Sequence, residues 1–181
     1  MPPRVIKTTS PVITSEDTSV KQVPATFKLV VWEKGTTNFD MGCGKWPALF
    51  TEALARMKVT NIPYDPYHVR ENEDHHKAME HLGKKLLDTV TCNNVLNVLN
   101  EERMIANVIK HCAGVVRKGG IAYFLIYEGD GSGVAGPTSK GWQNNRKAET
   151  YVEEIQKVFP YTRRRGNLIA ASDTDQTMYI I

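Results

Sequence analysis

The stretch that most constrains the fold of this chain runs from residue 38 to residue 47 and reads Asn-Phe-Asp-Met-Gly-Cys-Gly-Lys-Trp-Pro. It begins as a short apolar strand ending in Asp40, continues as a glycine loop and leads into a helix. Glycine adopts backbone angles closed to other residues, so Gly42 and Gly44 let the main chain approach a ligand with no Cβ in the way. A strand, a glycine-rich turn and a helix start are how α/β folds hold a nucleotide-like ligand at the C-terminal edge of a sheet.

The residues after the loop predict an amphipathic helix. Pro47 suits the first helical position, where a missing N–H costs nothing. Apolar residues then recur at the i, i+3, i+4, i+7 spacing of one helix face: Leu49, Phe50, Ala53, Leu54 and Met57. We expect this face to be buried against the sheet.

The glycine loop could belong to two ligand classes. A dinucleotide-binding loop usually reads G-x-G-x-x-G, and here Pro47 takes the place of the third glycine. What the loop has instead is Asp40, two residues before the first glycine. Asp40-x-Gly42-x-Gly44 resembles motif I of the class I S-adenosylmethionine-dependent methyltransferases, whose fuller form is [DE]-x-G-x-G-x-G. Trp46 stands where that family has its third glycine, and its indole either lines the pocket or shuts it.

A second acid follows at the spacing that such folds use. Residues 61–67 read as a short strand, imperfect because of Pro63, that ends on Asp65, 21 residues after Gly44. In doubly wound folds an acid at the end of the second strand accepts hydrogen bonds from ribose hydroxyls. The resemblance implies the same role here, toward the ribose of S-adenosylmethionine. The alternative is that Asp65 is a solvated turn acid before Pro66.

A third informative stretch covers residues 88–99. Its first half is β-branched and apolar, which predicts a buried strand, and Asn93 and Asn94 follow where that strand leaves the sheet. This resembles the family's fourth motif, whose C-terminal end faces the transferred methyl group. Enzymes that methylate exocyclic amines of DNA bases have a proline and a tyrosine there, whereas this chain has Cys92-Asn93-Asn94-Val95. No catalytic residue can therefore be named.

The rest of the chain alternates predicted helices and strands. We expect helices over 69–87, 101–116 and 148–159, a glycine stop at residues 117–120, an apolar strand over 121–127, and a final pair of strands at 168–171 and 178–181. With the resemblance, this pattern implies an α/β fold: a doubly wound, mostly parallel, Rossmann-like methyltransferase sheet with a C-terminal antiparallel hairpin.

Domain organisation is simple. Residues 1–26 are rich in Pro, Thr, Ser and Val, which predicts an extended or partly disordered arm, and residues 27–181 suit one domain. Within that domain, residues 27–32 read as a short strand or as a segment packed on the main sheet. No apolar run approaches the roughly 18 residues of a membrane helix. The N-terminus lacks a signal-peptide pattern, so a cytoplasmic protein without membrane contact is expected.

The spacing of the cysteines and the distribution of charge limit which metal ions and partners can be expected. Cys43, Cys92 and Cys112 form no CxxC pair or zinc spacing, so no metal site is expected. The net charge is only +3, but residues 140–165 contain seven cationic and three acidic residues, so the whole positive excess lies in this stretch. This stretch contains Trp142, Gln143 and Arg146, a set that can stack on and hydrogen-bond a base or can simply begin a helix.

These observations predict a methyltransferase that uses S-adenosylmethionine and resembles small phage and bacterial members of the family. The expected cofactor-binding residues are Asp40, Gly42, Gly44, Trp46, Asp65, Asn93 and Asn94. The expected substrate-binding residues are Tyr127, Trp142, Gln143 and Arg146. The acceptor stays open, with a base of DNA or RNA as one candidate. The alternatives are a catalytically inactive methyltransferase fold that binds nucleic acid or a protein, and an NAD-dependent oxidoreductase domain, which Pro47 disfavours.

Overall fold

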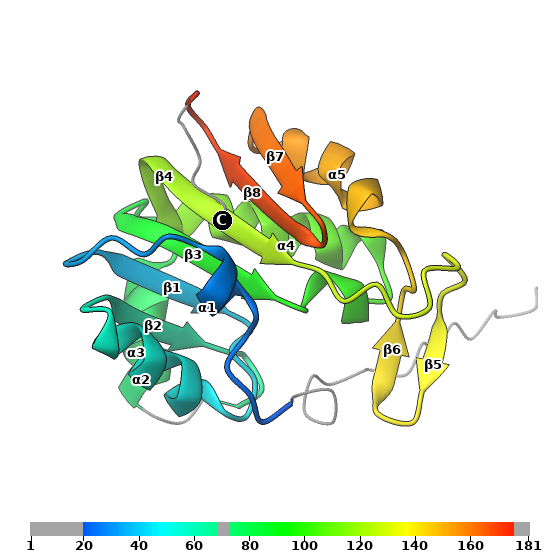
Figure 1. The fold of residues 1–181 in the computed structure, drawn as a ribbon, viewed down its shortest axis with the longest axis horizontal. Helices are drawn as coiled ribbons and strands as arrows, with labels where there is room; N and C mark the ends of the chain where they lie inside the picture. Colours follow the sequence, from blue (N-terminus) through cyan, green and yellow to red (C-terminus); the bar gives the residue numbers. More distant parts are fainter. Residues whose placement is uncertain (1–19, 69–72, 176–181) are drawn as a thin grey trace, which may run out of the picture.

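A six-stranded twisted sheet forms the centre of the molecule (Figure 1). The computed structural model describes residues 20–68 and 73–175. The strand order is β2-β1-β3-β4-β8-β7; the first four strands are parallel, and β8 and β7 add antiparallel at the end. The strands are β1 (Thr37–Met41), β2 (Thr60–Tyr64), β3 (Leu87–Asn93), β4 (Val116–Leu125), β7 (Tyr161–Arg165) and β8 (Leu168–Ser172). The predicted α/β, mostly parallel sheet with an antiparallel C-terminal hairpin is confirmed.

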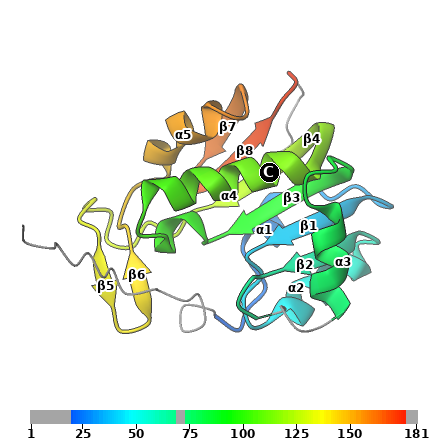
Figure 2. The ribbon, with the colours of Figure 1, turned by 180° about the vertical axis from the view of Figure 1, so that it is seen from behind.

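Helices cover both faces of the sheet (Figure 2). The elements are α1 (Thr26–Leu29), α2 (Pro47–Arg56), α3 (Glu73–His81), the 3-10 turn η1 (Leu96–Val98), α4 (Glu102–Val115), the 3-10 turn η2 (Ala148–Tyr151) and α5 (Val152–Gln156). On one face, Ala78 of α3, Ile109 of α4 and Ile155 of α5 join one buried cluster with the sheet. On the other face, α2 packs against the segment that follows α1, with Phe50 and Trp32 in edge-on ring contact.

The central strands are buried because both faces of the sheet are covered; β4 is apolar on both sides, whereas one side of β1 and β3 carries the buried polar residues Asn38, Asp40 and Thr91. Val90 in β3 and Ala122 and Phe124 in β4 have no exposed surface. The edge strand β2 tolerates Pro63, which has no N–H to donate, because β2 pairs only with β1. The sheet therefore ends at β2, and the C-terminal ends of β1, β2 and β3 lie together at one edge.

Several predicted boundaries differ from the structure. Residues 27–32 are not a strand: they form most of α1 and a segment packed on the sheet, with Val30 buried against Tyr123. The predicted helix over 69–87 falls partly outside the described residues, and α3 ends at His81 because Gly83 and Lys85 adopt positive φ angles. The glycine stop at 117–120 is wrong, since β4 begins at Val116 directly after α4.

The C-terminal half shows two further differences. The predicted helix over 148–159 is shorter and divided into η2 and α5. The antiparallel hairpin uses residues 168–171 as predicted, but their described partner is β7; residues 178–181 lie outside the described part of the chain. The glycine-rich stretch after β4 contains a small hairpin of β5 (Gly136–Thr138) and β6 (Gly141–Gln143). In Figure 1 this hairpin stands beyond the end of the sheet toward which β1 and β3 point.

Candidate functional site

One cavity of about 1170 Å³ lies at the C-terminal edge of the sheet, between the glycine loop and the β5–β6 hairpin. Ten of the eleven site residues predicted from the sequence line it: Asp40, Gly42, Gly44, Trp46, Asp65, Asn93, Asn94, Tyr127, Trp142 and Gln143. These residues come from segments far apart in the chain. The fold therefore brings nearly the whole predicted set to one place.

The glycine loop is held against the end of β2. Gly42 and Gly44 have φ angles of +75° and +68°, in the left-handed region that favours glycine. The N–H groups of Gly42 and Cys43 both donate to the carbonyl oxygen of Tyr64, at 2.7 and 3.1 Å. A Cβ on Gly42 would lie 2.5 Å from Cγ2 of Val95, so this position excludes larger residues by space as well as by backbone angle.

Asp65 is a buried part of the site, with 1% of its surface exposed. Its Oδ2 accepts the N–H of Gly44 at 2.9 Å, and its Oδ1 accepts the N–H of Tyr67 at 2.8 Å. The interpretation of Asp65 as a solvated turn acid is therefore wrong. The carboxylate fixes the glycine loop and still borders the cavity.

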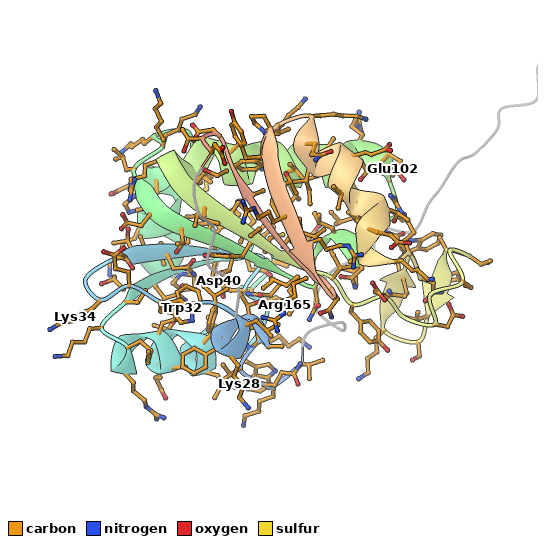
Figure 3. All side chains as sticks on the ribbon, turned by 45° about the horizontal axis from the view of Figure 1, so that its top comes forward. Lys28, Trp32, Lys34, Asp40, Glu102 and Arg165 are labelled. Carbon is orange, nitrogen blue, oxygen red and sulfur yellow. The ribbon has the colours of Figure 1, made fainter. Side chains whose placement is uncertain are left out.

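Asp40 is a second buried acid, 3% exposed, and Figure 3 shows it inside the fold near the end of β1. Its Oδ1 accepts hydrogen bonds from the hydroxyl of Thr91 at 3.1 Å and from the amide of Asn93 at 3.2 Å. Burial raises the pKa of Asp40 to about 7, and the charge of Asp65 acts in the same direction. None of the described residues that shift this pKa is a cation, so the carboxyl lies in a site that would favour a positively charged ligand group.

The two asparagines after β3 have different roles. Asn93 bridges two elements: besides contacting Asp40, its side-chain oxygen accepts a hydrogen bond from the hydroxyl of Thr26 in α1. Asn94 adopts a left-handed conformation with φ of 57° and donates its N–H to the carbonyl oxygen of Leu125 at 2.8 Å. The turn after β3 is thus fixed on both sides where it borders the cavity.

Trp46 lies at the cavity wall just before α2, with 42% of its surface exposed. The ammonium group of Lys21 lies 4.9 Å from the centre of its ring. The cavity remains open beside the indole, which favours a ring that lines the pocket over one that shuts it. Val20, Gln22 and Pro24 also line the cavity, so the segment before α1 crosses this edge.

Buried amides join the β5–β6 hairpin to the sheet. Asn97, which is 1% exposed, donates to Oε1 of Gln143 at 3.1 Å and accepts the N–H of Tyr127 at 3.4 Å. Gln143 in turn donates to the carbonyl oxygen of Tyr127 at 2.9 Å. Both backbone polar groups of Tyr127 are thereby held, while its side chain stays 59% exposed at the cavity.

Asn144 extends this connection. Its amide nitrogen donates to the carbonyl oxygens of Leu96 and Leu99, both at 3.0 Å, and its oxygen accepts the indole N–H of Trp142 at 2.8 Å. Neither Asn97 nor Asn144 was among the site residues predicted from the sequence. The available signal was the placement of amides next to apolar residues, as in Leu96-Asn97-Val98, because an asparagine in such a context must find partners when it is buried.

Arg146 is the one predicted site residue that the structure does not bring to the cavity. Its guanidinium forms ion pairs with Glu102 and Glu154, both at 3.0 Å, and lies 4.3 Å from the ring centre of Tyr151. Arg164 on β7 likewise pairs with Glu149 at 3.5 Å. These cations connect α4, η2, α5 and β7, and they do not line the cavity.

Among residues 20–68 and 73–175 there is no group of three or more His, Cys, Asp or Glu residues arranged to hold a metal ion. None of the described helices is both long enough and apolar enough to span a bilayer.

The sheet order, the glycine loop after β1 and the acid after β2 define the fold of the class I S-adenosylmethionine-dependent methyltransferases. No protein-family model and no curated protein sequence matches the chain. Solved structures do match, at low identity. The 1,6-didemethyltoxoflavin-N1-methyltransferase of Burkholderia thailandensis, with 1,6-didemethyltoxoflavin and S-adenosylhomocysteine bound, is 12% identical, with a TM-score of 0.58 over 78% of this chain and 72% of that chain.

Two further structures are similar. A S-adenosylmethionine-dependent methyltransferase from Clostridium acetobutylicum is 12% identical, with a TM-score of 0.52 over 81% of this chain and 85% of that one. An O-methyltransferase family protein from Burkholderia thailandensis is 16% identical, with a TM-score of 0.51 over 78% of this chain and 52% of that one. At these identities the likeness shows the fold.

Proposed function

We propose that this protein transfers a methyl group from S-adenosylmethionine. The observation that carries the proposal is the meeting of Asp40, the Gly42–Gly44 loop, Asp65 and Asn93 in one cavity at the C-terminal edge of the sheet. This is the edge at which open α/β sheets bind their ligands.

The residues present fit this cofactor in size and in charge. Ligand cavities of proteins typically span about 300–1,000 Å³, so a cavity of about 1170 Å³ has room for a nucleoside and a second small molecule. S-adenosylmethionine carries positive charge on its sulfur and its amino group. Asp40 provides a buried carboxyl whose pKa is lowered by no cation in the described part of the chain, and a cationic ligand group would stabilise its ionised form.

Each side chain then has a role. Asp65 would hold the ribose hydroxyls, and Asp40 with the glycine loop would hold the methionine part. Asn93 and Asn94 border the cofactor where the acceptor approaches, and Trp46 forms a wall. The bound cofactor supplies an electrophilic methyl group on a sulfonium. The protein aligns the acceptor with that group and keeps water out, and these two effects dominate a direct displacement.

In this proposal the acceptor enters from the side of the β5–β6 hairpin, whose residues line the cavity opposite the glycine loop. A nucleic-acid base was one candidate from the sequence. Lys140 and Trp142 at the cavity support it, but Arg146 and Arg164 are engaged in ion pairs away from the cavity. The similar Burkholderia thailandensis enzyme holds the small molecule 1,6-didemethyltoxoflavin beside S-adenosylhomocysteine, which supports a small-molecule acceptor.

The main alternative is a methyltransferase fold that binds without catalysing. It was motivated by Trp46 in place of a glycine, by the missing proline and tyrosine after Asn93 and by the short middle of the fold, and the open cavity beside the indole weakens only the first of these reasons. A thermal-shift experiment separates the possibilities. S-adenosylhomocysteine at 100 times its dissociation constant should stabilise the protein by roughly 2.7 kcal/mol. NAD⁺ should produce no shift, and a shift with NAD⁺ but not with S-adenosylhomocysteine would contradict the proposal.

A further inference from the structure

The cavity has a polar end and an apolar end. Asp40, Asp65 and Asn93 lie at the strand ends, where the cofactor is proposed to bind. The other end lies between the β5–β6 hairpin and the segment from η1 into α4. It is lined by Val98, Leu99, Met104, Val108, Val134 and Pro137. Polar side chains such as Asn107 and His111 also line the cavity, but its lining as a whole is more apolar than polar, which favours a largely apolar ligand.

Two aromatic side chains border this apolar end. Tyr127 lies at the end of β4 and Trp142 in β6, and both line the cavity. The backbone of Tyr127 is held by the buried amides of Asn97 and Gln143, and the indole N–H of Trp142 is held by the side-chain oxygen of Asn144. Asn145 braces the facing loop through hydrogen bonds with the carbonyl oxygen of Val134 at 2.9 Å and the N–H of Gly133 at 2.7 Å. Preorganised aromatic faces suit a planar ring.

The charges around the cavity disfavour an anion. Among the described lining residues the carboxyl groups are those of Asp40, Asp65 and Asp130, and the basic side chains are His111 and a single lysine, Lys140. Hydrogen bonds from Ser132 lower the pKa of Asp130, which keeps it ionised. The arginines that could neutralise phosphates lie elsewhere, with Arg146 bound to Glu102 and Glu154. A nucleic-acid strand would bring several phosphates to a cavity whose described lining offers one lysine, Lys140, together with Asp130.

We infer that the methyl acceptor is a small, uncharged, fused-ring heteroaromatic molecule seated between Tyr127, Trp142 and the apolar wall of the hairpin and α4. This inference rests on the proposed function. In the transfer, a ring nitrogen or hydroxyl oxygen of the acceptor donates its lone pair to the methyl carbon. The carbon–sulfur bond breaks with its electron pair remaining on sulfur, and the proton of the acceptor atom leaves to water.

The test measures ring binding by tryptophan fluorescence on the full chain, after calorimetry has established S-adenosylhomocysteine binding on the same sample. The probes are three neutral rings, lumazine, 2-hydroxyquinoxaline and 7-hydroxyquinoline. The matched anion is lumazine-6-carboxylate, and a twelve-nucleotide single-stranded DNA represents nucleic acid. We expect at least one neutral ring to bind saturably with little salt dependence, and lumazine to bind about tenfold more tightly than its carboxylate.

Variants locate the binding. Tyr127→Ala should weaken ring binding about tenfold, because stacking on an aromatic face is lost while the backbone hydrogen bonds stay. Trp142→Phe keeps a ring and should retain binding, whereas Trp142→Ala should lose it. Val134→Lys places a cation on a 72% exposed position and should narrow the preference for lumazine over its carboxylate. Tyr161→Ala, at an exposed ring outside the cavity, is the control.

Two results overturn the inference. One is binding of the carboxylate or the oligonucleotide as tight as that of the neutral rings. The other is no saturable signal from any neutral ring at millimolar concentration while S-adenosylhomocysteine binds. In both cases the cofactor proposal stands, because the calorimetric binding is measured independently. If Tyr127→Ala and Trp142→Ala leave the affinity for the neutral rings unchanged, the assigned site is also overturned.

Discussion

The carboxylate of Asp65 accepts the backbone N–H of Gly44 at 2.9 Å, which joins the end of β2 to the loop after β1 across 21 residues of sequence. The bond holds the loop in the left-handed conformation of Gly44 and leaves the same carboxylate bordering the cavity. One side chain thus shapes the loop and is proposed to bind the ribose.

Replacing Asp65 by alanine should weaken S-adenosylhomocysteine binding by about 1–3 kcal/mol, because a buried hydrogen-bond partner is removed. Calorimetry measures the change. Glu52→Ala, which removes an exposed acid from the neighbouring helix α2, should leave the affinity unchanged. Equal affinities of the Asp65→Ala variant and the parent would remove Asp65 from the site.

Asp40 should make the protein less stable as the pH rises. Its pKa is about 7 in the folded protein against 3.8 when exposed, so between these values the folded state binds more protons than the unfolded state. The free energy of unfolding therefore falls by up to about 4 kcal/mol as the pH rises from 3.8 to about 7, and Asp40 causes no further change above that pH. Asp40→Asn can still accept the bonds from Thr91 and Asn93 and should lack this slope. Urea unfolding at pH values from about 4 to about 8 gives the free energy of unfolding of the parent and of the Asp40→Asn variant. If the two free energies change with pH in the same way, Asp40 is not a buried ionisable carboxyl.

The same carboxyl should couple cofactor binding to pH. Because a ligand ammonium favours ionised Asp40, affinity for S-adenosylhomocysteine should increase as the pH rises through about 7, and Asp40→Asn should abolish the increase. 5′-Methylthioadenosine, which lacks the amino-acid group, serves as the control ligand and should show no such dependence. A pH-dependent affinity that persists in the Asp40→Asn variant would assign the titration to another group.

Trp46→Gly should weaken S-adenosylhomocysteine binding by roughly 1 kcal/mol, because the indole forms part of the cavity wall. Trp46→Phe keeps an aromatic face and should retain most of the affinity. Calorimetry again provides the comparison. If Trp46→Gly creates binding that the parent lacks, the indole closes the pocket and the alternative of an inactive fold gains support.

Arg146→Ala should reduce stability rather than ligand affinity. The change leaves Glu154, whose side chain is 23% exposed, without the guanidinium that pairs with it, and we expect a loss of about 1–3 kcal/mol in urea unfolding. Arg165→Ala, at an exposed position on β7, should change stability by less than about 0.5 kcal/mol. Unchanged stability with weakened ligand binding would return Arg146 to the binding site.

The cofactor side of the site was accessible from sequence because its signals are local. Asp40, Gly42 and Gly44 stand within five residues, and Asp65 follows at the spacing of a helix and a strand. The fold then brings them together through the parallel pairing of β1 and β2. The hairpin side was harder to predict, since Asn97 and Gln143 meet across 46 residues and no local pattern marks the pair.

Boundaries failed where long-range contacts override local preference. Arg117–Gly120 has the composition of a helix stop, yet it belongs to β4 because Arg117 pairs with Asp88 at 2.8 Å and Gly119 donates its N–H to Asp173 at 2.8 Å. Arg146 looked available for a ligand because its carboxylate partners Glu102 and Glu154 lie on two other helices. Neither partnership is visible without the tertiary structure.

The most direct test of the account is an isothermal titration of the full chain with S-adenosylhomocysteine. We expect saturable binding of one ligand per chain, with a negative heat-capacity change from the burial of apolar surface and with weaker binding in Asp65→Ala. No heat of binding at ligand concentrations up to the millimolar range, from a sample whose folding is verified, would contradict it.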